Sequence, residues 1–365
     1  MTKISTRKLE HLDLCARGDV ESRRTTLLED VQLLHDAIPE MSVDEVDPSV
    51  RLLGRKLASP IVISGMTGGA PRAGEINRAL ASAAQKFGFG MGLGSQRPML
   101  EEPHLVSTYR VRDVAPDVLL FANLGCVQAR DTPTGRIEDL VGAVGADALC
   151  LHLNVAQELA QDEGDRDFRG CCEAIARLVV ELSVPIVVKE TGCGLSPQNL
   201  SMLREFGVAM VDVAGVGGTT WPGVEALRGS ARQRALGEAL REWGIPTAAS
   251  IVYAERVGIP AIASGGIRSA LDVIRSLALG ATAVGLALPF LHAFESEGEA
   301  GVLAYSERLD ETLRALMLLV GARTMLDLQC SPILLGPTLQ SWTAKEFQGT
   351  PGRAKGPGRP KGASL

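Results

Sequence analysis

Short apolar runs and longer amphipathic segments alternate along the chain from about residue 58. Each run is rich in Val, Ile, Leu and Ala and ends in glycines or polar residues. Runs that are apolar throughout are typical of strands covered on both faces, and their alternation with helices predicts a parallel sheet. The expected strands are 60–65, 88–94, 117–125, 147–154, 185–190, 208–215, 259–266 and 281–288. The clearest expected helices are 72–87, 171–182, 268–280 and 303–321.

Eight strand–helix units predict an α/β fold, a closed (β/α)8 TIM barrel. An open doubly wound sheet is the alternative. The barrel is favoured because polar residues recur at the C-terminal end of nearly every expected strand, and in a barrel these ends converge on one mouth. We expect an N-terminal extension at 1–57 that contributes substrate contacts, the barrel at 58–348, and a disordered basic tail at 349–365, which is rich in Gly, Pro and Lys.

Composition narrows the class of protein. A formal net charge of −6 over 365 residues argues against a general nucleic-acid binder. No apolar run approaches the ~18 residues of a membrane span, so we expect no membrane partner. The seven cysteines are odd in number and lack a CxxC spacing, which predicts reduced thiols and a cytoplasmic location. We interpret the adjacent Cys171 and Cys172 as small residues on a buried helix face, with a redox site as the alternative.

The turn after the seventh expected strand has the composition of a phosphate site. In "ASGGIRS", Gly265 and Gly266 remove side chains so that backbone N–H groups can face an anion, and Arg268 adds a positive charge. The loops after strands 7 and 8 of a barrel commonly bind phosphate, and "GLALP" with Ala287 and Leu288 closes strand 8 here.

Other strand ends fit a heteroaromatic ring. Met66 and Thr67 follow the first strand and Asn123 ends the third, offering a flat contact, donors and acceptors. Lys189 ends an otherwise apolar strand, where an unpaired ammonium would be costly. Lys189 has two interpretations. It forms an ion pair with Glu190 or a neighbouring carboxylate, or it places a positive charge beside an electron-rich ring. Together with the phosphate turn, these residues predict a flavin mononucleotide (FMN) site.

A second anion site is indicated by two clusters of donors, which could hold a diphosphate. The clusters are Arg7 with Lys8, and Ser95, Gln96 and Arg97 in "GSQR". The alternative for the first cluster is an ordinary charged N-terminus.

The end of the fourth strand carries four polar residues within seven positions. Glu158 could bind Mg²⁺, a hard cation that often bridges carboxylate and phosphate oxygens. His152 is either a site residue or a hydrogen-bonded core histidine. Asn154 and Gln157 complete the group.

The chain closely resembles the type 2 isopentenyl-diphosphate isomerases. The shared motifs occur in family order, from "RKLEH" at 7–11 through "SGMTGG", "GLGSQR", "HLNVAQE", "GDRDF", "GGTTW" and "WGIPTAAS" to "ASGGIR". The resemblance implies interconversion of isopentenyl and dimethylallyl diphosphate on a (β/α)8 barrel with reduced FMN, with NADPH or NADH as the reductant, and with Mg²⁺. It also implies a small prenyl diphosphate as the substrate and a homo-oligomer, a tetramer or octamer.

The resemblance assigns roles residue by residue. FMN contacts are implied for Met66, Thr67, Gly68, Ser95, Asn123, Lys189, Thr219, Gly265, Gly266, Ile267, Arg268, Ala287 and Leu288. Substrate contacts are implied for Arg7, Lys8, Ser95, Gln96, Arg97, His152, Asn154 and Gln157. His152, Gln157 and Lys189 are the expected catalytic residues, and Glu158 the expected metal ligand. One departure is Ala214, where the family carries a hydroxyl residue near the flavin.

The expected mechanism shifts the double bond by protonating one carbon and deprotonating another. Reduced FMN would exchange the proton at N5 while Lys189 stabilises the anionic ring and Mg²⁺ neutralises the diphosphate. One rival function is a 2-hydroxy-acid oxidase, which needs a His–Arg pair after strand 6, where this chain has "AGVGGTTW". Another is a non-catalytic flavin-binding protein that uses the basic tail as a contact element.

Overall fold

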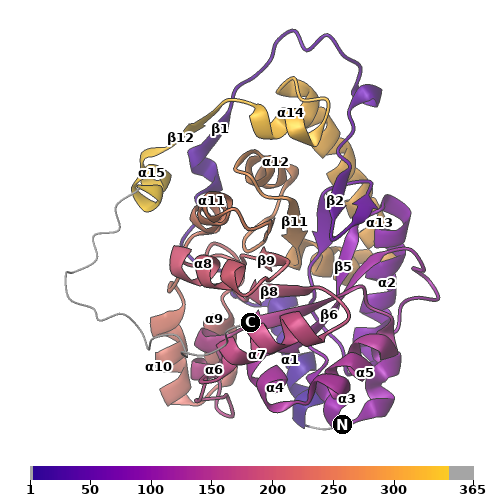
Figure 1. Cartoon of the computed structure of the whole chain (residues 1–365), viewed down its shortest axis with the longest axis vertical. Coiled ribbons are helices and arrows are strands. Elements are labelled where there is room, and N and C mark those ends of the chain that lie inside the picture. The colour runs from indigo at the N-terminus through magenta and orange to yellow at the C-terminus, as the bar shows by residue number, and fades with distance from the viewer. Residues whose placement is uncertain (1–2, 345–365) are drawn as a thin grey trace, which may run out of the picture.

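Eight parallel strands close into a barrel in the computed structural model, which describes residues 3–344 (Figure 1). The strands are β4 (Ile61–Ile63), β5 (Gly90–Gly92), β6 (Leu119–Gly125), β7 (Ala148–Leu153), β8 (Ile186–Glu190), β9 (Met210–Asp212), β10 (Ala261–Ala263) and β11 (Ala283–Leu286). Pairing of Val284 in β11 with Ile61 in β4 completes the ring. All eight expected strands are present, and the closed ring excludes the open sheet.

Helices between the strands cover the outside of the barrel (Figure 1). The longer ones are α2 (Pro71–Phe87), α5 (Thr134–Val144), α7 (Cys171–Glu181), α8 (Pro197–Glu205), α10 (Ala231–Leu240), α11 (Thr247–Val257) and α12 (Ala270–Ala278). Shorter helices in the connections are α3 (Arg97–Glu101), α4 (Cys126–Asp131), α6 (Val155–Ala160) and α9 (Trp221–Arg228). Apolar residues of the outer strand faces pack against these helices in the larger of the two buried clusters.

The helix expected at 303–321 is confirmed as the second part of α13 (Leu288–Leu319), in which two helices meet at a kink at Glu297 and Gly298, where the backbone leaves helical angles. The expectation for the two adjacent cysteines is wrong. Cys171 and Cys172 do not lie on a buried helix face, because Cys171 is half-buried and Cys172 exposed. The buried residues of α7 are Ala174, Ile175 and Leu178 further along the helix.

The barrel interior has its own apolar cluster, which is closed at the N-terminal end of the strands by a hairpin. The hairpin pairs β2 (Val50–Leu52) with β3 (Arg55–Leu57). Its Leu52 and Leu57 pack with the inward residues Val62, Leu119, Phe121, Ala148, Cys150, Val187, Met210, Ile262 and Ala283. Only the opposite, C-terminal end is therefore left for a ligand.

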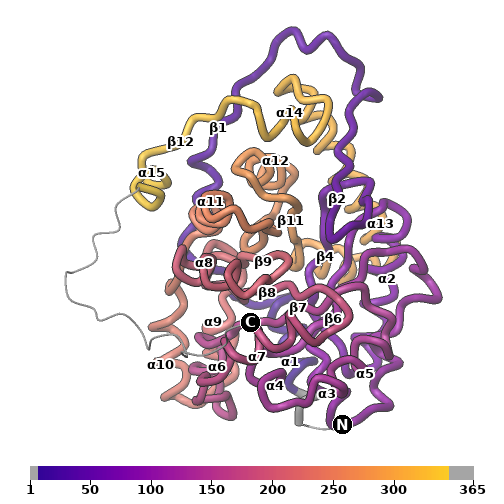
Figure 2. The backbone as a smooth tube through the Cα atoms, in the orientation of Figure 1, coloured from indigo at the N-terminus to yellow at the C-terminus, as the bar shows by residue number. Residues whose placement is uncertain are grey.

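The N-terminal extension also reaches that opposite end. Its helix α1 (Lys3–Arg17) contacts α9 and α13, and the segment after it runs along 218–220, where Ser22 N donates to Gly218 O at 2.7 Å. Further on, β1 (Val31–Leu33) pairs antiparallel with β12 (Ile333–Leu335), so the extension lies beside the C-terminal segment (Figure 2). After β12 come α15 (Pro337–Thr343) and the expected tail at 349–365, which lies outside the described residues.

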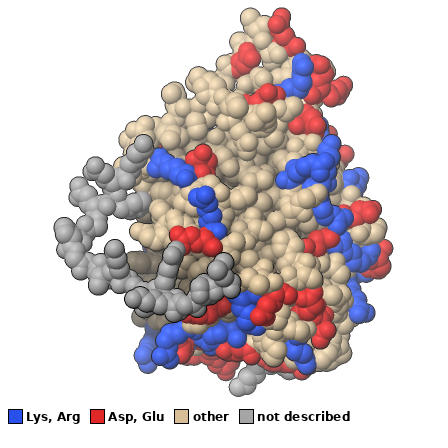
Figure 3. Space-filling view, in the orientation of Figure 1, with Lys and Arg blue, Asp and Glu red and all other residues tan. Residues whose placement is uncertain are grey.

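Charges of both signs are interspersed on the face drawn in Figure 3. This distribution agrees with the mixed composition of the chain and does not form a single basic stripe on that face. Within residues 3–344, no helix combines the length and the apolar character that crossing a membrane requires.

Candidate active site

One cavity of about 260 Å³ opens at the C-terminal ends of the barrel strands, beneath α1. It brings together most of the site residues expected from the sequence, although they are spread from residue 7 to residue 288. The expected residues that line it are Arg7, Lys8, Met66, Thr67, Ser95, Arg97, Asn123, His152, Asn154, Gln157, Glu158, Lys189, Thr219, Gly265, Gly266, Ile267, Arg268, Ala287 and Leu288.

Gly68 and Gln96 do not line the cavity, and both support residues that do. A methyl group on Gly68 would overlap the Tyr109 ring, so glycine is needed for this close approach. Gln96 is fully buried, and its Oε1 accepts a hydrogen bond from Asn123 N at 3.0 Å. Both positions therefore shape the site from behind its wall.

The turn after β10 forms a cradle without side chains. Gly265 and Gly266 have φ angles of +93° and +74°, which favour glycine. A methyl group on Gly218, in the facing loop, would overlap the backbone nitrogen of Gly266. Arg268 lines the cavity beside them, and its Nε donates to Glu21 of the extension at 2.7 Å. Backbone donors and a guanidinium in a glycine-lined turn fit a phosphate group.

Two buried hydroxyls face the cavity without a hydrogen-bond partner among the described residues. They are Ser64 Oγ, at the end of β4, and Thr67 Oγ1. Buried polar groups are nearly always satisfied in native proteins, so unpaired hydroxyls in a cavity wall indicate a polar ligand. With the glycine cradle, they satisfy the requirements of FMN, whose ring edge and phosphate both need hydrogen-bond partners.

Lys189 forms an ion pair with a carboxylate on the next strand. Its Nζ lies 2.9 Å from Asp212 Oδ2 in β9 and 3.4 Å from Ser264 Oγ, which also donates to Asp212. Glu190 is not its partner, because successive strand residues face opposite sides of the barrel wall. An ammonium has three donors, so one remains for a ligand in the cavity that Lys189 lines.

Glu190 instead holds the turn after β8. Its Oε2 accepts hydrogen bonds from the backbone nitrogens of Thr191, at 2.6 Å, and Cys193. Burial raises the pKa of this carboxyl to about 7, against the lowering effect of these backbone donors and of Lys189. Thr191 and Gly192 of this turn line the cavity.

His152 is a neutral hydrogen-bonding group at the barrel mouth. Burial, followed by the charges of Lys189 and Lys8, lowers its pKa to about 4. Asn123 donates from Nδ2 to Leu93 O at 2.9 Å, so its Oδ1 is the acceptor that faces His152 Nδ1 at 2.8 Å. This network assigns the proton to Nδ1 and leaves Nε2 as an acceptor.

Three cationic side chains meet where α1 crosses the cavity. Lys8 Nζ donates to Ser95 O at 2.7 Å and to Tyr109 Oη at 2.9 Å. Burial, with a smaller effect of Arg7, lowers the pKa of Lys8 to about 7. Burial and the nearby Arg97 likewise lower the pKa of Arg7. Cations that disfavour one another's charge are suited to a polyanionic ligand, which would relieve their repulsion.

Glu158 is buried at the edge of this cationic group. Its Oε1 accepts from Asn154 Nδ2 at 2.7 Å and its Oε2 from Asp165 N at 2.8 Å. No group of three or more His, Cys, Asp and Glu side chains in the described part of the chain could enclose a metal ion. Glu158 is the carboxylate here that could hold a Mg²⁺ ion, a hard cation that binds oxygen ligands.

A buried network that was not expected from the sequence joins α1 to α9. His11 Nε2 lies 2.9 Å from Glu225 Oε1, which also accepts from Gln157 Nε2 at 3.3 Å. Burial alone would raise the pKa of Glu225, but the partners His11 and Arg228 hold it below its ordinary value. The i,i+4 spacing of Arg7 and His11 on one helix could have revealed His11, whereas Glu225 gives no sequence signal.

Comparison with known proteins agrees with this geometry. Residues 152–334 match the FMN-dependent dehydrogenase family. An isopentenyl-diphosphate delta-isomerase of Methanothermobacter thermautotrophicus is 46% identical over 341 residues, which are 93% of this chain and 95% of that protein. One from Synechococcus sp. is 48% identical over 303 residues, 82% of this chain and 87% of that protein.

Solved structures share the fold. A mandelate oxidase variant with benzaldehyde superposes with a TM-score of 0.61 at 21% identity, covering 92% of this chain and 97% of that chain. At this identity the likeness concerns the barrel alone, whereas the identities above cover nearly whole chains. The chain therefore belongs to the isopentenyl-diphosphate delta-isomerases, in the FMN-dependent type 2 family.

Proposed function

We propose that this enzyme interconverts isopentenyl and dimethylallyl diphosphate with reduced FMN and Mg²⁺, and that NADPH supplies the reducing equivalents. The observation that carries the proposal is the single cavity in which a phosphate cradle, a ring-sized polar wall and a separate cationic cluster meet. The similarity to proteins named isopentenyl-diphosphate delta-isomerase supports the choice of substrate.

FMN would be held by the polar wall and the cradle. Its phosphate would bind the turn at Gly265–Arg268 and the loop at Ala287 and Leu288, and its ring would contact Thr67, Met66 and Asn123. When bound in its reduced form, FMN would supply a nitrogen that can exchange a proton and an electron-rich ring. The spare donor of Lys189 would favour negative charge at that ring, and the ion pair with Asp212 fixes where the ammonium lies.

The diphosphate would bind the cationic cluster of Arg7, Lys8 and Arg97. Binding would draw Lys8 back to its charged form, because a nearby anion raises the pKa that burial has lowered. Glu158 would hold Mg²⁺, which would supply positive charge to neutralise the diphosphate. Anchoring one end of the substrate restricts the other end, so the binding energy of the diphosphate positions the reacting carbons.

His152 and Gln157 would act on the prenyl end. Neutral His152 presents Nε2 as an acceptor, and Gln157 is oriented by its bond to Glu225. Both can position a proton or a water molecule without becoming charged. Because His152 and Gln157 are neutral, the apolar prenyl group would not have to bind beside a charged side chain at these two positions.

The test is an anaerobic assay of the purified full-length protein with isopentenyl diphosphate, FMN, NADPH and Mg²⁺. We expect dimethylallyl diphosphate, and loss of turnover when FMN, NADPH or Mg²⁺ is left out. Absence of product beside an active isomerase control would contradict the proposal and favour a non-catalytic flavin protein.

The 2-hydroxy-acid oxidase alternative has little support. Residues 213–221, which follow β9, contain neither histidine nor arginine. Such an oxidase needs both groups there, to deprotonate the alcohol and to hold its carboxylate. Mixing the flavin-loaded enzyme with lactate or mandelate should leave the flavin absorbance unchanged; bleaching would favour the oxidase.

A further inference from the structure

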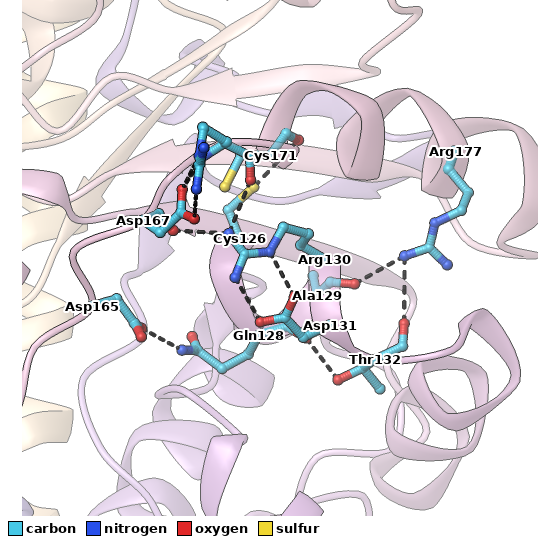
Figure 4. A network of polar contacts seen from close by, with 11 residues as sticks. Cys126, Gln128, Ala129, Arg130, Asp131, Thr132, Asp165, Asp167, Cys171 and Arg177 are labelled. Carbon is cyan, nitrogen blue, oxygen red and sulfur yellow. Dashed lines mark hydrogen bonds and ion pairs between the residues drawn. The ribbon is translucent and has the colours of Figure 1, made fainter.

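Two cysteines from distant parts of the chain meet outside the active-site cavity (Figure 4). Cys126 is the first residue of α4, directly after β6, and Cys171 is the first residue of α7. The Cys126 thiol lies 3.6 Å from the backbone oxygen of Cys171 and points toward it. The barrel thus brings together two cysteines that are 45 positions apart.

The two thiols differ in access to solvent. Cys126 is buried, with 3% of its surface exposed, whereas Cys171 is half-buried. The adjacent Cys172 is exposed, but its sulfur lies 3.8 Å from Met202 Sδ in α8. An oxidant from solvent would therefore reach Cys171, and Cys126 is the cysteine whose thiol lies against the Cys171 backbone.

The charges around Cys171 favour its thiolate. Its thiol is at the N-terminus of α7, an 11-residue helix whose dipole favours negative charge. The hydrogen bond from Cys126 and the Arg130 guanidinium lower the pKa of Cys171 to about 7, against burial, Asp131 and Glu173. The neighbouring Cys172 has a raised pKa, because burial, Glu173 and Cys171 disfavour its thiolate.

Arg130 is held in place by the loop that precedes α7. Its Nη1 donates to Asp167 O at 2.8 Å and to Arg169 O at 2.9 Å, and its other nitrogens bind Asp131 (Figure 4). A methyl group on Gly170 would lie 3.0 Å from the Arg130 side chain, so the guanidinium stem packs against the residue before Cys171. The charge beside the thiol is therefore fixed by the fold.

We propose that Cys126 and Cys171 form a redox-active dithiol that reacts with hydroperoxides. The Cys171 thiolate attacks the peroxide oxygen, which gives a sulfenic acid and releases water or an alcohol. The Cys126 thiol then attacks the Cys171 sulfur, forms the disulfide and releases a second water. The two thiols together lose two electrons and two protons, and the peroxide is reduced by two electrons.

Two hydrogen bonds connect the segments that carry this dithiol to the active-site residue Glu158. Gln128, two residues after Cys126, lines the cavity and donates to Asp165 Oδ2 at 2.9 Å. Asp165 N donates in turn to Glu158. The disulfide would join the segments on either side of this link.

The first test treats reduced, FMN-loaded protein with about one equivalent of hydrogen peroxide and maps the peptides by mass spectrometry. We expect a peptide pair linked through Cys126 and Cys171, which dithiothreitol separates. In Cys126→Ser, Cys171 should accumulate as a sulfenic acid that dimedone captures. Cys172→Ser is the matched control and should still form the link. A Cys171–Cys172 link, or reduced Cys126 in protein whose Cys172 and Cys330 are oxidised, would overturn the proposal.

The second test needs no variant and compares the alkylation of neighbouring thiols by iodoacetamide. The rate at Cys171 should rise with pH and level off above about pH 7, while that at Cys172 keeps rising. At pH 7 the thiolate fraction is larger at Cys171 than at Cys172, while the more acidic thiol is the weaker nucleophile. Together these effects predict a reaction at least about fivefold faster at Cys171. Equal rates and equal pH profiles would contradict the proposal.

Discussion

Tyr109 supports, from outside the cavity, the wall that carries Lys8 and Ser95. Its ring is fully buried against Gly68, and its hydroxyl donates to Ser95 O at 2.8 Å while accepting from Lys8 Nζ. Burial raises the pKa of this phenol, so it remains a hydrogen-bond donor at every working pH. Gly68 thus allows the Tyr109 ring to lie where its hydroxyl contacts both Lys8 and the backbone oxygen of Ser95.

Replacing Gly68 with alanine should destabilise the protein by about 1–3 kcal/mol, because the new methyl group overlaps the Tyr109 ring. Gly135→Ala is the matched control. A methyl group at Gly135, in helix α5, meets nothing within 4 Å, and alanine favours helix there. Urea denaturation of both variants checks this; equal stabilities would contradict the packing.

Glu158→Gln should abolish Mg²⁺-dependent turnover while leaving FMN bound. The amide keeps the size of the side chain but loses the charge that a hard cation requires. Asp162→Asn, an exposed neutralisation on the following loop, should behave as wild type. Turnover and bound flavin are measured on the same sample, and full activity of Glu158→Gln would refute the metal role.

At the scale of single elements, the turn after β8 is built around a buried carboxyl. The pKa of Glu190 is raised from 4.5 to about 7. Between pH 4.5 and pH 7, the Glu190 carboxyl is therefore protonated in the folded protein and ionised in the unfolded chain. Its contribution to stability is therefore complete below about pH 4.5 and disappears as the pH rises through 7.

The pH dependence of the free energy of unfolding should change in Glu190→Gln. Between pH 5 and 7.5, wild type should lose roughly 2 kcal/mol relative to the variant. Glu205→Gln, an exposed residue of α8, is the matched control and should follow wild type. Denaturation curves at both pH values provide the measurement, and parallel curves for Glu190→Gln and wild type would contradict the raised pKa.

Helix α1 should act mainly in substrate binding. Arg7→Ala removes one charged donor from the diphosphate cluster, which is worth about 1.5–3 kcal/mol. We expect KM for isopentenyl diphosphate to rise roughly ten- to hundredfold, with the flavin still bound. Arg17→Ala, at the exposed end of the same helix, is the control. An unchanged KM for Arg7→Ala would exclude the helix from the site.

The strands were predictable because all eight are short apolar runs that end in polar residues, and the barrel then determines where those ends meet. This is why residues as distant as Thr67 and Arg268 could be assigned to one site. Asp212 was not foreseen as the partner of Lys189, since pairing between strands depends on register. The Tyr109–Gly68 contact and the meeting of Cys126 with Cys171 arise from packing between loops, for which the sequence carries no periodic pattern.

At the scale of the whole molecule, one extension closes the barrel at one end and completes the site at the other. The β2–β3 hairpin fills the N-terminal end, and α1 places Arg7 and Lys8 over the mouth. Glu21, between them in sequence, accepts a hydrogen bond from Arg268 in the glycine turn after β10. The extension is therefore integral to the enzyme, while its expected assembly into a tetramer or octamer stays a prediction.

The most direct measurement is a titration of the purified protein with FMN, followed by quenching of flavin fluorescence. One FMN should bind per chain. Arg268→Ala should weaken binding at least about tenfold, since it removes a charged donor from the phosphate turn, and Arg7→Ala should leave it unchanged. A protein that takes up no FMN, or that loses FMN binding equally in both variants, would contradict a flavin seated on the last two strand ends of the barrel.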